Sequence, residues 1–178
     1  MSLPNLITIG RILLVPLTVW LIVSGDFLLA FLVFITAGVS DAVDGILARR
    51  LNLRTELGGY LDPLADKLLL VSIYVTLGFQ RQLPAWLVIL VASRDIMIVG
   101  AVILSWLMDK PISVKPLMVS KANTVAQIML AGIVLAVLGF GLAVEPLLAA
   151  GYIAVAALTV ASVAFYMVEW VGHMANGG

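Results

Sequence analysis

Four aspartates are the residues of this sequence whose type and spacing point most directly to chemistry. Asp41 and Asp44 are three residues apart in one apolar segment, and Asp62 and Asp66 are four residues apart in the next. On helices, both spacings place the two side chains on one face, one turn apart. Sites built only from carboxylate oxygens suit hard divalent cations such as Mg²⁺, Mn²⁺ or Ca²⁺. The pattern therefore predicts a divalent-metal site.

The two pairs of aspartates also lie at matching depth. Residues 50–57 form a short polar connector, and at the helical rise both pairs sit about 6–12 Å from it. If the connector turns tightly between antiparallel helices, the four carboxylates converge. Four isolated ionised carboxylates in a bilayer cost on the order of 10 kcal/mol together, so a cation must compensate them. The alternative, helix-end charges reaching the interface with Arg49 and Arg54 as partners, accounts for one or two aspartates but not for four.

The stretch from Asp41 to Asp66 resembles the signature of the CDP-alcohol phosphatidyltransferase family. The signature begins with Asp41, two residues, Asp44-Gly45, two residues and Ala48-Arg49. After eight further residues come Gly58, three residues, Asp62, three residues and Asp66. The resemblance implies an integral-membrane enzyme that transfers a phosphatidyl group from CDP-diacylglycerol to an alcohol and releases CMP. It implies that two divalent cations, Mg²⁺ or Mn²⁺, bind Asp41, Asp44, Asp62 and Asp66 and clamp the pyrophosphate. It also implies that Asp66 is the base that takes the proton of the acceptor hydroxyl.

Small and polar residues near the aspartates are candidates for binding the nucleotide. Spacing alone leaves open whether the small side chains allow a nucleotide to approach the backbone or allow helices to pack closely. The family signature implies nucleotide contacts for Gly45, Ala48, Arg49 and Gly58. Asn5, Thr8 and Arg11 lie at three-residue spacing on one helical face and resemble the start of family members. We expect them to contact the nucleotide end, with a capping role at the interface as the alternative.

Three basic residues, Arg94, Lys115 and Lys121, are candidates for binding the acceptor. Arg94 and Asp95 stand in the middle of an apolar segment, where unpaired charge is costly, so we expect them to face the bundle interior or an aqueous cavity. They either satisfy each other and neighbouring polar groups, or Arg94 helps the two lysines hold an anionic acceptor. Residues 61–67, 93–95, 115–116 and 120–127 resemble the eukaryotic-type cardiolipin synthases of this family. That implies phosphatidylglycerol as the acceptor, with glycerol 3-phosphate, the acceptor of phosphatidylglycerophosphate synthases, as the alternative.

Composition places these residues in a membrane protein. The 178 residues are 63% hydrophobic and 11% charged, whereas a soluble chain usually carries about 25% charged residues. Six apolar segments are long enough for a spanning helix, which needs roughly 17–25 residues. We expect them at Leu6–Ser24, Phe27–Arg49, Gly58–Phe79, Leu83–Leu107, Val119–Phe140 and Pro146–Val171. Their short connectors predict one all-α domain over residues 1–178, an integral-membrane antiparallel bundle of six transmembrane helices.

Basic residues orient this bundle. They gather near the second-to-third and fourth-to-fifth connectors, at Arg49, Arg50, Arg54, Lys110, Lys115 and Lys121, while the opposite connectors carry Arg81 alone. By the positive-inside rule the carboxylate side and both termini are cytoplasmic, and the expected location is a bacterial inner membrane. The net charge of zero gives no reason to expect a nucleic-acid partner, and the absence of cysteine excludes disulfides and thiolate metal sites. Related enzymes are homodimers, and the resemblance implies the same here.

Two other classes of protein stay open as alternatives. A cation channel or transporter also uses intramembrane aspartates, but its path needs polar groups across the bilayer or at its midplane. Here the acidic pairs cluster toward one face, and the far halves of the same segments are apolar. Prenyl-transferring membrane enzymes bind a diphosphate through Asp-rich metal motifs, but they generally have more than six spans and a different aspartate spacing.

Overall fold

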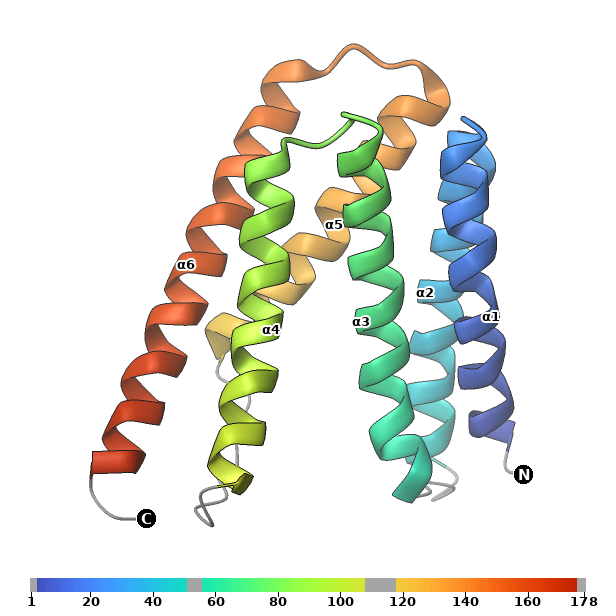
Figure 1. The fold of residues 1–178 in the computed structure, drawn as a ribbon. Helices are drawn as coiled ribbons and strands as arrows, with labels where there is room; N and C mark the ends of the chain where they lie inside the picture. The colour runs from blue at the N-terminus through green and yellow to red at the C-terminus, as the bar shows by residue number, and fades with distance from the viewer. Residues whose placement is uncertain (1–2, 51–55, 108–117, 176–178) are drawn as a thin grey trace. The chain divides into compact units, whose positions relative to one another are not determined.

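Six α-helices make up most of the described part of the chain. The computed structural model describes residues 3–50, 56–107 and 118–175, and the side chains of most of these. The helices are α1 (Leu3–Val23), α2 (Phe27–Arg50), α3 (Glu56–Phe79), α4 (Ala85–Leu107), α5 (Met118–Phe140) and α6 (Glu145–Ala175) (Figure 1). No strand occurs within these ranges, so the all-α expectation is confirmed. Each helix coincides with a predicted segment, with ends that differ by a few residues.

These helices belong to two compact units. The first comprises Met1–Leu83 and Ala131–Val144, and the second comprises Pro84–Leu130 and Glu145–Gly178. The helix α5 contributes residues 131–140 to the first unit and residues 118–130 to the second. The single domain expected from the sequence stays a prediction.

In the first unit, α1 packs against both α2 and α3. The helices α2 and α3 run in opposite directions, and the start of α1 lies at the same end of the unit as the end of α2 and the start of α3 (Figure 1). The core of this unit is apolar, and its fully buried side chains include Ile22, Ala30, Ile73, Leu77 and Leu135. The packing therefore brings the residues around Asp41 to Asp66 and the first turns of α1 to one end of the unit.

Three helices of the first unit, α1, α3 and α5, are followed by left-handed residues. Gly25 follows α1 with φ of 81°, Arg81 follows α3 with φ of 59°, and Gly141 follows α5 with φ of 65°. After each of them an amide donates five residues back, from Asp26 to Leu21, from Gln82 to Leu77 and from Leu142 to Val137, at 2.9–3.0 Å. This hydrogen-bond pattern is the Schellman helix end, which satisfies carbonyl groups that the helix leaves unpaired.

In the second unit, α4 packs against α6, and the buried side chains are of two kinds. Leu87, Val91 and Val155 form an apolar part that is at most 1% exposed. The polar part is unusual for so hydrophobic a chain and comprises Arg94, Asn123, Gln127, Thr159 and Ser162, each at most 3% exposed. Because a buried polar group costs free energy unless it is hydrogen-bonded, this polar part calls for a specific explanation.

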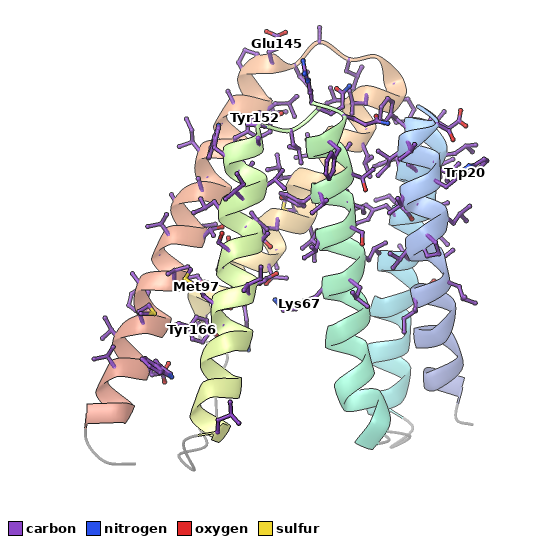
Figure 2. The ribbon with its side chains drawn as sticks, in the orientation of Figure 1. Trp20, Lys67, Met97, Glu145, Tyr152 and Tyr166 are labelled. Atoms are coloured by element: carbon purple, nitrogen blue, oxygen red, sulfur yellow. The ribbon has the colours of Figure 1, made fainter. Side chains whose placement is uncertain are left out.

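The outer surface of the helices is apolar. Large exposed side chains occur on all six helices, among them Trp20, Phe79, Ile96, Ile153 and Val168, and Figure 2 shows Trp20 projecting away from α1. Among the described residues, the segments Met118–Phe140 and Glu145–Gly172 are long and apolar enough to cross a membrane, judged by length and composition. Extensive exposed apolar surface is rare in soluble monomers and suits contact with lipid.

Candidate active site

The four aspartates occupy equivalent positions on two antiparallel helices of the first unit. Asp44 lies six residues before Arg50 at the end of α2, and Asp62 lies six residues after Glu56 at the start of α3. At 1.5 Å per residue, both positions are about 9 Å from the helix ends that face the connector. Asp41 and Asp66 are each about one turn further along their helices. The matching depth predicted from the sequence therefore holds for the backbone.

This donor set fits divalent cations in its chemistry. Two pairs of carboxylates on neighbouring helix segments offer several hard oxygen ligands, which Mg²⁺ and Mn²⁺ prefer. The side chains of all four aspartates lie outside the part of the chain whose side chains the structure describes. Within that part, no group of three or more potential metal ligands occurs. The assignment of the metal to the four aspartates stays a prediction that rests on their positions along α2 and α3.

The predicted nucleotide-binding residues belong to the same end of the first unit. Gly45, Ala48 and Arg49 lie on the last turns of α2, and Gly58 lies on the first turn of α3. Asn5 and Thr8 lie on the first turns of α1, whose start is at this end (Figure 1). The fold therefore brings segments far apart in the sequence to one place. The contacts of these side chains lie outside the described part of the structure, and their role stays a prediction.

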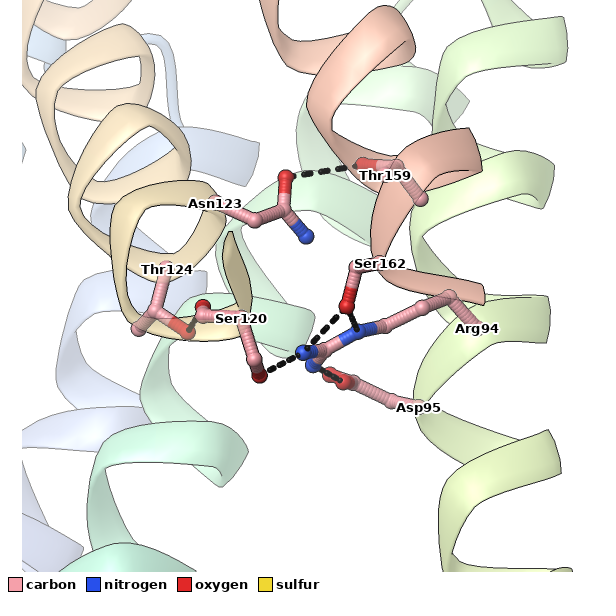
Figure 3. A network of polar contacts seen from close by, with 7 residues as sticks. All are labelled: Arg94, Asp95, Ser120, Asn123, Thr124, Thr159 and Ser162. Carbon is pink, nitrogen blue, oxygen red and sulfur yellow. Dashed lines mark hydrogen bonds and ion pairs between the residues drawn. The ribbon is translucent and has the colours of Figure 1, made fainter. Parts of the chain in front are cut away.

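Arg94 is the centre of a polar network that connects three helices of the second unit. Its Nη1 forms an ion pair with Asp95 of α4 at 2.5 Å. Its Nη2 donates to the hydroxyl of Ser120 on α5 and, at 3.1 Å, to the hydroxyl of Ser162 on α6, to which Nε also donates at 3.3 Å (Figure 3). The Arg94 side chain is 3% exposed. The expectation that Arg94 faces the interior is confirmed, and its role in binding the acceptor stays a prediction.

Asn123 lies beside this network with half of its amide satisfied. Thr159 of α6 donates its hydroxyl to the Asn123 Oδ1 at 3.0 Å. Both residues are fully buried. Among the described residues, no hydrogen-bond acceptor is within reach of the Asn123 Nδ2. Figure 3 shows this nitrogen on the side of the amide that faces Ser162 and Arg94.

The other predicted acceptor residues are less constrained by the structure. Lys121 is exposed and directly follows Ser120 on the first turn of α5. Lys115 lies outside the described residues. Thr159 and Ser162 are not among the residues predicted from the sequence, although two hydroxyls three residues apart in a long apolar helix share one face. That spacing is the signal by which they could have been found.

Comparison with known proteins identifies the family. The family model described as CDP-alcohol phosphatidyltransferase matches residues 1–170 of the chain. The chain belongs to this family. The resemblance inferred from the aspartate signature is thereby confirmed.

Relatives within the CDP-alcohol phosphatidyltransferases carry two kinds of name. A chloroplastic CDP-diacylglycerol–glycerol-3-phosphate 3-phosphatidyltransferase of Oryza sativa is 37% identical, over 73% of this chain and 45% of its own length. The CMP-forming cardiolipin synthase of Homo sapiens is 36% identical, over 72% of this chain and 48% of its own length. A CDP-diacylglycerol–glycerol-3-phosphate 3-phosphatidyltransferase of Bacillus subtilis is 39% identical, over 56% of this chain and 59% of its own length. The chain thus spans about half the length of these relatives.

Proposed function

We propose that the chain transfers a phosphatidyl group from CDP-diacylglycerol to the hydroxyl of a glycerol-containing acceptor and releases CMP. The observation that carries the proposal is the equal placement of Asp44 and Asp62, six residues from the facing ends of α2 and α3, within a family signature. The acceptor we propose is phosphatidylglycerol, so that the product is cardiolipin. The resemblance of residues 61–67, 93–95 and 120–127 to cardiolipin synthases supports this choice, as does the name of the human relative.

In this proposal the aspartates hold the reacting groups in place. Asp41, Asp44, Asp62 and Asp66 bind two divalent cations, Mg²⁺ or Mn²⁺, which when bound neutralise charge on the pyrophosphate and on the departing CMP. Asp66 takes the proton of the acceptor hydroxyl. The hydroxyl oxygen then forms a bond to the phosphorus that carries diacylglycerol, and the bond from this phosphorus to the CMP oxygen breaks.

The remaining residues bind the two ends of the substrates. Asn5, Thr8, Gly45, Ala48, Arg49 and Gly58 contact the cytidine diphosphate, which is consistent with the position of their helix segments at one end of the first unit. Arg94, Lys115 and Lys121 contribute positive charge for an acceptor that carries phosphate. The chain forms a homodimer of six-span bundles, as the family resemblance implies. The aspartates face the cytoplasm, and the clustering of basic residues near the two connectors on that side supports this orientation.

Glycerol 3-phosphate is the second candidate for the acceptor. The relatives from Oryza sativa and Bacillus subtilis are named for this acceptor, and their identities to the chain are as high as that of the human cardiolipin synthase. The two acceptors share a glycerol group with a free primary hydroxyl, so both fit the same reaction.

Purified protein tests the proposal directly. It is incubated with CDP-diacylglycerol, MgCl₂ and either phosphatidylglycerol or glycerol 3-phosphate, and CMP and the lipid product are quantified by mass spectrometry. We expect CMP release that depends on an acceptor, with cardiolipin as the preferred product. A preference for glycerol 3-phosphate would correct the acceptor, and no acceptor-dependent CMP release with either would refute the function.

The variant Asp66→Asn separates the base from the metal site. Because an amide cannot accept the hydroxyl proton but keeps one oxygen ligand, we expect loss of turnover with magnesium-dependent binding of CDP-diacylglycerol largely retained. Binding is measured by microscale thermophoresis with and without EDTA. Full turnover in this variant would remove Asp66 from the role of base.

A further inference from the structure

Gln80 connects the ends of two helices of the first unit. It follows the last residue of α3, and its backbone amide donates to the Thr76 carbonyl at 3.1 Å, which fixes it to the last turn of that helix. Its side-chain Nε2 donates to the carbonyls of Ile22 and Val23, the last two residues of α1, at 2.8 and 3.1 Å. Carbonyl groups at the end of a helix lack partners within it. One side chain thus holds the end of α1 to the end of α3.

The other buried groups of these two helices do not supply such a connection. Their buried side chains are mainly apolar and include Leu21, Ile73 and Leu77. The buried hydroxyls of Thr18 and Thr76 donate to carbonyls of their own helices at 2.7 and 2.6 Å. Apolar contacts are not directional, and packed helices slide past one another by small amounts. The directional hydrogen bonds of the glutamine therefore suit the task of fixing which residues of α1 and α3 lie level, which we call the axial register.

This axial register can be followed to the other end of the unit. Both helices start there and run parallel (Figure 1). The residues that the two hydrogen bonds join differ by 58 and 57 in number. Because both helices rise by the same 1.5 Å per residue, the same differences place Thr8 level with Asp66 and Asn5 level with Asp62. The predicted nucleotide-binding residues of α1 therefore lie level with the predicted metal-binding residues of α3.

The proposed reaction depends on this match. One molecule of CDP-diacylglycerol has to meet the nucleotide-binding residues of α1 and the aspartates of α3 at the same time. A slip of one residue between the helices displaces the two groups by about 1.5 Å along the axis. A misplacement of about 1 Å costs on the order of 100-fold in rate, even when its cause lies far from the reacting atoms.

We propose that Gln80 is a positioning residue for the reaction. Its side-chain amide fixes the axial register of α3 against α1 at one end of the first unit, and the two stiff helices carry that register to the substrate-binding turns at the other end. This inference rests on the proposed function and adds to it a residue about 21 Å along α3 from Asp66, at the helical rise over 14 residues.

Substitution of Gln80 tests the role in the reaction. Gln80→Leu removes both donated hydrogen bonds, and we expect KM for CDP-diacylglycerol to rise about tenfold or more. Gln80→Lys restores a donor, because an ammonium group also donates to carbonyls at a helix end, and we expect KM to return to within about threefold of the wild type. Lower stability reduces the amount of active enzyme but leaves KM unchanged, so KM separates positioning from a merely structural role.

Thr76→Val is the matched control for these variants. It removes a hydroxyl of the same helix, one turn before Gln80, that donates to the Ser72 carbonyl within α3 at 2.6 Å. The connection between α1 and α3 is kept, so we expect an unchanged KM. If Gln80→Leu does not fold, which thermal unfolding in detergent reports, Gln80→Glu takes its place, because a carboxylate of the same length has no donor.

A distance measurement follows the axial register without using activity. The chain has no cysteine, so Trp20→Cys on α1 and Leu68→Cys on α3, at two exposed positions, carry a pair of spin labels. On the register described above these positions are about 15 Å apart along the helix axes, and sliding changes their separation. By pulsed electron paramagnetic resonance we expect one narrow distance with Gln80 or Gln80→Lys, and a wider or shifted distribution with Gln80→Leu.

The outcomes distinguish this inference from the proposed function. Unchanged distances in Gln80→Leu, or changed distances with an unchanged KM, overturn the positioning role and leave the function standing. A raised KM with unchanged distances also overturns it, because the effect then does not pass through the register. If the wild-type protein releases no CMP with either acceptor, the proposed function fails and the positioning role fails with it.

Discussion

Gly139, in the last turn of α5, packs directly on the backbone of Leu28 in the first turn of α2. A β-carbon built on Gly139 would lie 2.8 Å from the Leu28 Cα and 2.9 Å from its nitrogen. Next to this contact, the rings of Phe31 and Phe140 meet edge to face with centroids 6.0 Å apart. Small residues at helix contacts let backbones approach closely, which is how helices associate where water supplies no driving force.

The first prediction concerns this contact. In Gly139→Ala the new methyl group collides with backbone atoms that cannot move aside as a side chain does, so we expect a loss of about 1–3 kcal/mol of stability. Thermal unfolding in detergent measures it. Gly38→Ala on α2 is the matched control, because nothing lies within 4 Å of a β-carbon there, and alanine favours a helix over glycine. Equal melting temperatures for the two variants would contradict the close contact.

The second prediction concerns the ion pair of Arg94 and Asp95. Arg94→Met removes a buried guanidinium that pairs with the Asp95 carboxylate at 2.5 Å, so we expect a loss of about 3–5 kcal/mol. The double variant Arg94→Met/Asp95→Leu removes both charges, and we expect it to recover part of that loss. Thermal unfolding of the wild type and the three variants, including Asp95→Leu, forms a double-mutant cycle. Additive effects would mean that the two charges are not coupled.

The third prediction concerns metal removal. If the aspartates bind two divalent cations, EDTA abolishes CMP release and added Mg²⁺ or Mn²⁺ restores it. In Asp44→Asn, one ligand loses its charge, and we expect the Mg²⁺ concentration for half-maximal activity to rise at least tenfold. Asp26→Asn is the control, since Asp26 lies between α1 and α2, away from the signature, and we expect an unchanged Mg²⁺ dependence. Activity in EDTA equal to that in Mg²⁺ would exclude a metal-dependent mechanism.

The fourth prediction concerns orientation in the membrane. The chain has no cysteine, so a single introduced cysteine reports one position. We expect Asn52→Cys to react with a membrane-impermeant maleimide in inside-out vesicles and Gln82→Cys to react in right-side-out vesicles. Labelling of both from one side would contradict the six-span topology.

The helices were predictable because each comes from one long apolar segment, a local property of the sequence. The start of α1 differs from the prediction: the first apolar segment is expected from Leu6, whereas the helix begins at Leu3. Proline is tolerated in the first turn of a helix, where its missing N–H costs nothing, and Pro4 therefore does not delay the start.

The polar network was only partly predictable. The need to bury and pair Arg94 follows from its place in an apolar segment, and this was confirmed. Its partner Ser162 did not follow, because hydroxyls in apolar helices often bond to their own helix, as Thr18 does to the Leu14 carbonyl at 2.7 Å. Which hydroxyl turns instead to a neighbouring helix depends on packing between segments distant in the chain. Sequence spacing carries little of that information.

The same network has a consequence for biogenesis. Arg94 depends on Ser162, which is synthesised 68 residues later. At about 5–20 residues per second, the ribosome adds Ser162 several seconds after Arg94. Until then Arg94 has only Asp95 of its own helix and Ser120 of α5 as partners, so on the proposed topology we expect the insertion machinery to retain α4 until α6 emerges. Crosslinking of stalled nascent chains that end before and after α6 would show whether this retention occurs.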